Sequence, residues 1–196
     1  MSKNLIKRII TSIILLFLLF FINFSHQLIF ISSILLIGFL ICYEGKNIFS
    51  KLISLHSKKK KIHNLNFKFL ILNIIFFFYV FFIFCNFTIK IYTIEGSLYF
   101  LYLISICIFT DIGGYAFGKF IGGKKLTKIS PNKTIAGAIG SFFFSLIPLI
   151  LYSNLNYINL EFDLRHIFFA LTISLISQLG DLFISFFKRK VKIKDT

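Results

Sequence analysis

Six long apolar runs divide this chain of 196 residues, and they constrain its fold more than any other feature. They cover roughly residues 9–24, 28–43, 69–88, 97–110, 135–152 and 166–187. These lengths approach the ~17 to 25 residues that an α-helix needs to cross a bilayer. Because 57% of the residues are hydrophobic, a soluble domain of this length could not bury them all. The sequence therefore predicts an all-α polytopic integral membrane protein with about six transmembrane helices.

The basic residues predict how these helices are oriented. If the N-terminus is cytoplasmic, every Lys and Arg except Lys90 and Arg165 falls on the cytoplasmic side. We therefore expect six spans, both termini in the cytoplasm, and a multi-pass protein of the cell's inner (plasma) membrane. The net charge of +15 follows from this topology, so we expect membrane lipids as partners and no nucleic acid. The first two runs are short, and a re-entrant pair over residues 9–43 stays open as an alternative.

Motifs are distributed unevenly along what we predict to be a single membrane domain, residues 1–196. Residues 1–96 supply roughly three spans and carry no motif, whereas residues 97–196 carry all the motifs described below. The polar, basic segment 54–68 is typical of a cytoplasmic loop lying against anionic head groups. We therefore expect the functional half of the chain, residues 97–196, to begin near residue 97.

Two of the seven acidic residues differ from the others in their position. Asp111 and Asp181 each lie at the cytoplasmic end of an apolar run, at the same predicted membrane depth. A carboxylate beside the hydrocarbon is costly, so it usually faces a polar cavity, pairs with a cation or binds a metal. Interfacial snorkelling, or a structural pair with Lys, is the alternative interpretation.

Residues 111–137, which begin at the first of these carboxylates and lie between the two apolar runs that carry them, are rich in glycine and lysine. Gly114, Gly118 and Gly122 recur every four residues, which places them on one helix face and allows close helix packing. A turn signalled by "SPN" follows, surrounded by basic and hydroxyl side chains: Lys124, Lys125, Lys128, Ser130, Lys133 and Thr134. Such groups can cradle phosphates, and hard cations such as Mg2+ bind carboxylate and phosphate oxygens. No Walker motif is present.

Three stretches match, in order and spacing, the motifs of one enzyme family. They are "DIGGYAFGK" from Asp111, "KISPNKTIAG" from Lys128 and "GDLFISFFKRKVKIKDT" from Gly180. The corresponding patterns are approximately D-[TS]-G-A-Y-x-x-G-[KR], K-[IV]-S-P-x-K-T-[WY]-[EQ]-G and G-D-L-x-E-S-x-x-K-R-x4-K-D-x-G. Residues 97–196 thus resemble the phosphatidate cytidylyltransferase (CDP-diglyceride synthetase) family, whereas the N-terminal half matches only in being apolar.

This resemblance implies a reaction and a set of site residues. The family transfers CMP from CTP to phosphatidate, giving CDP-diacylglycerol and pyrophosphate, with Mg2+ as cofactor. By matching position, Asp111, Lys133 and Asp181 are the expected catalytic residues, and Asp181 is the expected metal ligand. The expected substrate-binding residues are Ser130, Thr134, Lys188, Arg189, Lys194 and Asp195. A homodimer is a candidate assembly.

Three departures from the family pattern leave alternatives open. Ala136 stands at an acidic or amide position and Ile184 at a Glu position. The family pattern also continues into L-P-G-H-G-G-x-x-D-R-x-D, with a further metal-binding Asp, whereas this sequence stops at Thr196. The alternatives are a truncated inactive member, or a CTP-dependent enzyme acting on another lipid phosphate or alcohol. A small membrane transporter is less favoured, because both carboxylates lie at the membrane edge rather than at its midplane.

Overall fold

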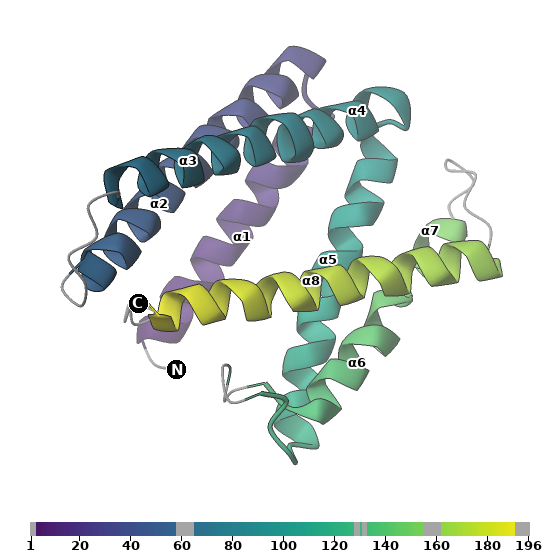
Figure 1. The fold of residues 1–196 in the computed structure, drawn as a ribbon. Coiled ribbons are helices and arrows are strands. Elements are labelled where there is room, and N and C mark those ends of the chain that lie inside the picture. The colour runs from purple at the N-terminus through teal and green to yellow at the C-terminus, as the bar shows by residue number, and fades with distance from the viewer. Residues whose placement is uncertain (1–2, 58–64, 128–129, 131–132, 155–161, 191–196) are drawn as a thin grey trace.

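The computed structural model describes residues 3–57, 65–127, 130, 133–154 and 162–190, and its regular elements are helices apart from one isolated bridge (Figure 1). This confirms the all-α prediction. The elements are α1 (Lys3–Phe24), α2 (Gln27–Ser57), α3 (Leu65–Phe78), the π-helix η1 (Tyr79–Cys85), α4 (Asn86–Ile94), α5 (Ser97–Phe120), α6 (Ile135–Ser145), α7 (Ile147–Ser153) and α8 (Leu164–Lys190).

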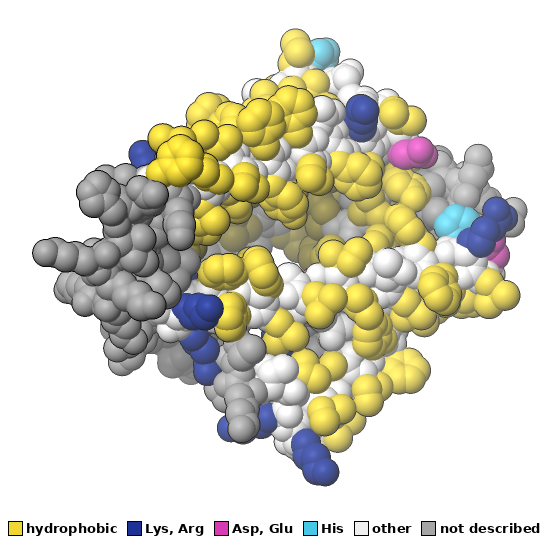
Figure 2. Space-filling view, viewed as in Figure 1, with side chains coloured by type: hydrophobic (Ala, Val, Ile, Leu, Met, Phe, Trp, Pro, Cys, Tyr) yellow, Lys and Arg dark blue, Asp and Glu magenta, His cyan; other side chains and the backbone are white. Residues whose placement is uncertain are grey.

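Within the described residues, five helical segments are long and apolar enough to cross a membrane. They are Gln27–Lys51, Phe69–Ile94, Ser97–Phe120, Ile135–Ser153 and Leu164–Lys190, and the apolar part of α1, Ile10–Phe24, is shorter. Large apolar side chains point outward from these helices, and Figure 2 shows hydrophobic side chains over much of the visible face. The polytopic membrane fold is thus confirmed, while the orientation of the termini stays a prediction.

The helices extend beyond the apolar runs that predicted them. The fourth run was expected to end at residue 110, but α5 continues to Phe120 and contains Asp111 well before its end. Likewise α2 continues to Ser57 and α3 begins at Leu65, so residues 54–57 and 65–68 are helical rather than part of a loop; residues 58–64 lie outside the described residues. A hydropathy run stops at the first polar residue, whereas a helix continues as long as its backbone hydrogen bonds are satisfied.

Two rods, one continuous and one broken, and one long helix determine the architecture. In Figure 1, α3, η1 and α4 follow one another as a single rod beside α2. The α6 and α7 helices form a second, broken rod, because Pro148 in the first turn of α7 cannot supply the backbone N–H that would continue α6. The α8 helix packs against α5, α6 and α7, and crosses them in the view of Figure 1. This crossing brings residues far apart in the sequence together beside α5.

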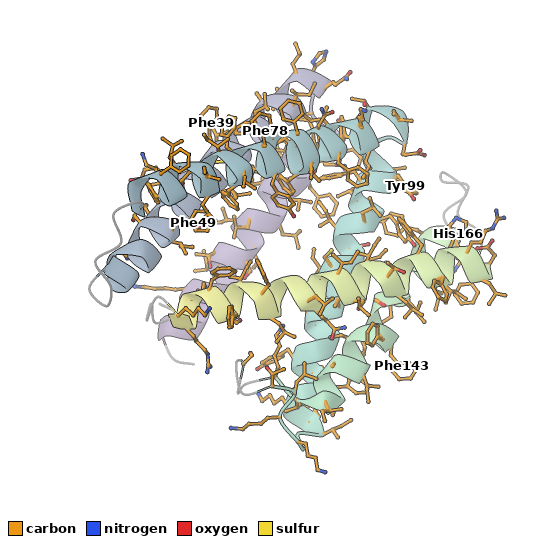
Figure 3. All side chains as sticks on the ribbon, viewed as in Figure 1. Phe39, Phe49, Phe78, Tyr99, Phe143 and His166 are labelled. Atoms are coloured by element: carbon orange, nitrogen blue, oxygen red, sulfur yellow. The ribbon has the colours of Figure 1, made fainter. Side chains whose placement is uncertain are left out.

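The buried side chains form two separate clusters. One joins α2 to η1 through Phe30, Ile34, Val80 and Cys85. Around it, aromatic side chains crowd the α2 and α3 side of the molecule, where Figure 3 labels Phe39, Phe49 and Phe78. The other cluster joins α5, α7 and α8 through four side chains, Tyr102, Ile106, Leu149 and Ala170. The second cluster fixes how α8 lies against α5.

Candidate active site between α5, α6 and α8

The α5 and α6 helices approach closely because small residues face each other. A Cβ at Gly137 would lie 2.7 Å from the carbonyl oxygen of Gly114, and one at Gly113 would lie 2.6 Å from that of Gly140. Real Cβ atoms essentially never come this near to backbone, so glycine is required at both positions. This close approach places the residues that follow Thr110 on α5 directly beside the first turns of α6.

The predicted glycine face is correct for two of its three members. Gly114 and Gly118 lie on α5 opposite α6, where a Cβ at Gly118 would come 3.3 Å from Thr134 Oγ1. Gly122 is wrong as a packing residue, because α5 has already ended at Phe120. Gly122 and Gly123 instead have φ of +64° and +90°, a region that favours glycine, and they turn the chain out of the helix.

A short hairpin then leads the chain back into α6. Leu126 N donates to Lys133 O at 2.8 Å, and Ile135 N donates to Lys124 O at 3.0 Å. Thr134 is the N-cap of α6, and its Oγ1 accepts a hydrogen bond from Gly137 N at 3.0 Å. These bonds fix Lys133 one residue before the cap, at the positive end of the α6 dipole.

A cavity of about 290 Å³ lies where the hairpin, α5, α6 and α8 meet. Its charged lining consists of Asp111 from α5, Lys133 from the hairpin and Asp181 from α8. The other lining residues are Gly114, Tyr115, Leu126, Thr134, Gly137, Ala138, Ser141 and Gln178. All three stretches that carry the sequence motifs therefore contribute to a single cavity.

An ion pair crosses this cavity and links α8 to the N-terminus of α6. Lys133 Nζ lies 2.9 Å from Asp181 Oδ2, and the two side chains are 33% and 53% exposed. Asp111 forms no salt bridge with any residue that the structure describes. The described lining thus holds two carboxylates and one ammonium group, which leaves one negative charge unbalanced.

The comparisons with known proteins agree with the motifs that form this cavity. The model of the Cytidylyltransferase family matches residues 47–196, which is most of the chain. This chain belongs to that family. The matched region includes all of the cavity lining, so the family motifs and the cavity coincide.

Curated relatives match about half of the chain. The "Phosphatidate cytidylyltransferase" of Staphylococcus aureus (strain COL) is 45% identical over 105 residues, which are 52% of this chain and 39% of the relative. The protein of the same name from Staphylococcus haemolyticus (strain JCSC1435) is 40% identical over 104 residues, with the same coverage. The match therefore spans well under half of the length of these relatives. No solved structure matches the chain.

The structure brings together four of the residues predicted from the sequence. Asp111, Lys133, Thr134 and Asp181 all line the cavity. Ser130 lies in the hairpin, where its N–H donates to Thr127 Oγ1 at 3.2 Å and its carbonyl oxygen accepts from Lys133 N at 3.1 Å. It does not line the cavity among the residues described, so its predicted contact with a phosphate has no support from the geometry.

The remaining predicted residues follow Asp181 toward the C-terminus. Lys188 and Arg189 lie in the last turn of α8, about two turns beyond Asp181, and are not part of the cavity lining in the described structure. Lys194 and Asp195 lie outside the described residues. The substrate-binding roles expected for these four residues stay predictions.

Three polar residues of the cavity were missed by the sequence reasoning: Tyr115, Ser141 and Gln178. Tyr115 is one turn beyond Asp111 on α5, and Gln178 is one turn before Asp181 on α8, so helical spacing from the two carboxylates would have found both. Ser141 Oγ donates to Thr110 O at 2.8 Å, a bond from α6 to α5 that no spacing rule indicates.

The two hydrophobic departures from the family pattern lie outside the cavity. Neither Ala136 nor Ile184 is among its lining residues, and Ile184 is 54% exposed on α8.

The cavity lining fits a hard divalent cation. No group of three or more His, Cys, Asp or Glu side chains occurs among the described residues, so a closed protein cage for a metal is not found there. Mg2+ is commonly bound by one or two carboxylates together with substrate phosphates and water. Asp111 and Asp181 supply two such carboxylates, and Ser141 and Gln178 add neutral oxygen atoms to the same lining.

Proposed function

We propose that the chain carries the site at which CMP is transferred from CTP to phosphatidate, giving CDP-diacylglycerol and pyrophosphate. The observation that carries this proposal is the single cavity in which Lys133 and the capped N-terminus of α6 face two carboxylates. Membership of the cytidylyltransferase family supports the nucleotide chemistry. The printed name of the relatives, phosphatidate cytidylyltransferase, supports the choice of lipid.

The N-terminus of α6 is the proposed binding site for the CTP phosphates. Lys133 supplies a positive charge, and the N-terminus of α6 is the positive end of its dipole. The N–H groups of Ile135 and Gly137 already donate to Lys124 O and Thr134 Oγ1, so the dipole and Lys133, rather than these two amides, would attract the phosphates. Thr134 Oγ1 already accepts from Gly137 N, so its own hydroxyl proton is available to a phosphate. These groups would orient the triphosphate without forming a covalent bond to it.

Asp111 and Asp181 are the proposed ligands of Mg2+. When bound, the cation would neutralise charge on the phosphates and on the pyrophosphate leaving group. Because the two carboxylates come from α5 and α8, the proposed ligand pair also depends on how α8 crosses α5. Asp181 would have to exchange its contact with Lys133 for this role.

The proposed step is an in-line displacement at the α-phosphorus of CTP. A phosphate oxygen of phosphatidate forms a bond to this phosphorus, while the bond to the oxygen that bridges to the β-phosphate breaks. The bridging oxygen keeps the electron pair, so pyrophosphate leaves. The lipid would reach the cavity from the bilayer between the spanning helices, and the nucleotide from the cytoplasm, as the distribution of basic residues predicts.

The direct test is product formation by the purified chain in detergent. Labelled CTP and phosphatidate are incubated with Mg2+, both with this chain and with the chain extended by the C-terminal family pattern described above. We expect labelled CDP-diacylglycerol whose formation requires Mg2+ and is lost in Asp181→Asn. The matched control is Glu95→Gln, an exposed acidic residue after α4 that lies outside the cavity.

Two outcomes would overturn the proposed function. If neither protein forms CDP-diacylglycerol from phosphatidate, the proposed reaction is wrong. If CMP is transferred only to another lipid phosphate in a substrate panel, the family chemistry stands but the proposed lipid is wrong.

A further inference from the structure

Lys133 has two competing partners in the proposed reaction. In the structure its ammonium group lies 2.9 Å from Asp181 Oδ2, the carboxylate proposed to bind the divalent cation. The same ammonium group lines the cavity and belongs to the residue directly before the N-cap of α6, where phosphates are proposed to bind. An ammonium group and a divalent cation that share one carboxylate repel each other, so a cation at Asp181 would weaken the contact between that carboxylate and Lys133.

The charges of the lining determine which arrangements are balanced. With Lys133 paired to Asp181, the described lining carries one excess negative charge, on Asp111. Addition of a divalent cation at the two carboxylates would leave one excess positive charge, carried by the displaced ammonium group. A phosphate at the N-terminus of α6 would then offset this charge.

We infer that Lys133 acts as an exchangeable counter-ion, holding Asp181 while the cavity is empty of ligands and moving to a phosphate when a divalent cation binds. This inference rests on the proposed function, because it assumes a cation at Asp181. The binding of cation and phosphate would then be coupled. A bound cation frees the Lys133 ammonium group for the phosphate, and a bound phosphate draws that ammonium group away from the carboxylate that the cation needs. The cavity would thereby favour a cation and a phosphate together over either one separately.

The geometry allows this movement without a change of fold. The backbone of Lys133 is fixed by the bonds Leu126 N to Lys133 O and Lys133 N to Ser130 O, so only its side chain has to move. The side chains of Lys133 and Asp181 are 33% and 53% exposed, so a separated pair remains accessible to solvent. An exposed ion pair of this kind contributes little to stability, so separating Lys133 from Asp181 requires little free energy.

The test measures cation affinity directly, with Mn2+ as the probe. Free Mn2+ is counted by electron paramagnetic resonance in titrations of the full chain in detergent, without nucleotide or lipid. Lys133→Ala removes the competing ammonium group, so we expect Mn2+ to bind about two- to fivefold more tightly than to the unmodified chain, the range that an exposed ion pair allows. Lys133→Arg keeps the ion pair and should not tighten Mn2+ binding.

A second titration tests the coupling, with inorganic phosphate as the anion. After correction for the Mn2+ that phosphate binds in the absence of protein, phosphate should tighten Mn2+ binding to the unmodified chain by about two- to fivefold, because it draws away the same ammonium group that Lys133→Ala removes. In Lys133→Ala most of this gain should be lost. Lys90→Ala is the matched control, because it removes one positive charge from the exposed surface of α4, in the other half of the molecule.

The outcomes separate this inference from the proposed function. If Lys133→Ala binds Mn2+ no more tightly than the unmodified chain, or if phosphate acts equally on both, the counter-ion exchange is wrong. If Mn2+ does not bind to the unmodified chain, or binds equally to Asp181→Asn, the proposed cation site is wrong, and so is the counter-ion exchange that depends on it. If the affinities follow the expected order but no CDP-diacylglycerol forms, the exchange stands and the proposed reaction is wrong.

Discussion

The two halves of this molecule pack by opposite means. In the N-terminal half, large side chains fill the space between α2 and the α3–η1–α4 rod, as where the rings of Phe30 and Tyr92 stack with centroids 3.7 Å apart. In the C-terminal half, glycines occupy the closest contacts between α5 and α6, and Gly137 packs directly against the backbone of Gly114. Aromatic packing can be achieved by many combinations of bulky residues, whereas backbone contact admits essentially one residue type.

This difference coincides with the location of the cavity. Among the described residues, the cavity with Asp111, Lys133 and Asp181 lies entirely in the C-terminal half. The glycine contacts hold the first turn of α6 against α5 and so determine where Lys133 stands relative to Asp111. Packing that allows only glycine is thus found where charged groups must be positioned. Packing that many large apolar residues could provide is found where the helices need only be apolar.

The sharpest test of this contrast removes one acidic group from each half. Asp181→Asn should lower the kcat/KM of CMP transfer by about 100-fold or more, the scale on which preorganised electrostatic groups act. Glu95→Gln, beside α4, should leave kcat/KM within about twofold of the unmodified enzyme, because it is exposed and outside the cavity. The measurement is labelled CTP turnover in detergent. Equal losses in the two variants would show that the cavity has no special role.

A second comparison places the same methyl group in both halves. Gly137→Ala puts its Cβ against the backbone oxygen of Gly114, so α5 and α6 must separate, and we expect a loss of about 1 to 3 kcal/mol in stability. In Gly38→Ala the nearest atom, at 2.6 Å, is Cys85 Sγ, which belongs to a side chain and can rotate away. Its expected loss, measured by thermal unfolding in detergent, is therefore smaller.

A double substitution sharpens this prediction. Gly38→Ala combined with Cys85→Ala removes the atom in the way, so Gly38→Ala should cost less in the Cys85→Ala background than alone. No side-chain deletion can rescue Gly137→Ala, because its obstacle is backbone. If Gly38→Ala destabilises the chain as much as Gly137→Ala, the proposed contrast between the two interfaces is wrong.

The sequence predicted the spans well and their ends poorly. Hydropathy identified every apolar segment, since a membrane helix has to be apolar over most of its length. It ended the fourth run at residue 110, because the criterion cannot follow a helix past Asp111. In the structure Asp111 lies within α5, where it lines the cavity together with residues of α6 and α8.

For the candidate site, the motifs predicted which residues matter, but not which ones touch. Asp111, Lys133, Thr134 and Asp181 were all identified, and all four line the cavity. The pairing of Lys133 with Asp181 was not specified, because 48 residues separate them and only the crossing of α8 brings them together. Contacts of this kind depend on tertiary packing, which residue spacing does not encode.

A smaller effect should come from the cap of α6. Thr134→Ala removes the oxygen that accepts from Gly137 N, so we expect a loss of about 1 kcal/mol in stability, while Thr134→Ser should keep most of it. Thr88→Ala in the N-terminal half is the matched control. Thr88 Oγ1 donates to Phe84 O within the helix, a bond that adds little to helix stability. Similar unfolding temperatures for Thr134→Ala and Thr88→Ala would contradict the assigned role of the cap.

The smallest expected effect concerns the start of α8 and depends on pH. The backbone N–H of His166 donates to Asp163 Oδ1 at 2.9 Å, with further bonds from His166 Nδ1 and Arg165 Nε, and these hold the pKa of Asp163 down to about 2. A carboxyl group whose pKa is lowered on folding stabilises the folded state above its unfolded pKa of about 3.9. That contribution should disappear as the pH falls from about 4 toward 2.

Asp163→Asn tests this assignment, because it keeps a cap of similar shape but does not titrate. The unmodified chain should unfold at a higher temperature than Asp163→Asn at pH 5, and the difference should shrink as the pH approaches 2. Glu95→Gln serves as the reference, because the structure gives Glu95 no salt bridge among the described residues. Equal unfolding temperatures for the two proteins throughout pH 5 to 2 would mean that Asp163 caps α8 by its shape rather than by its charge. The start of α8 would then not depend on the charge of its cap, as the N-terminal helices do not depend on charge. Positioning by charge in the C-terminal half would be confined to the cavity.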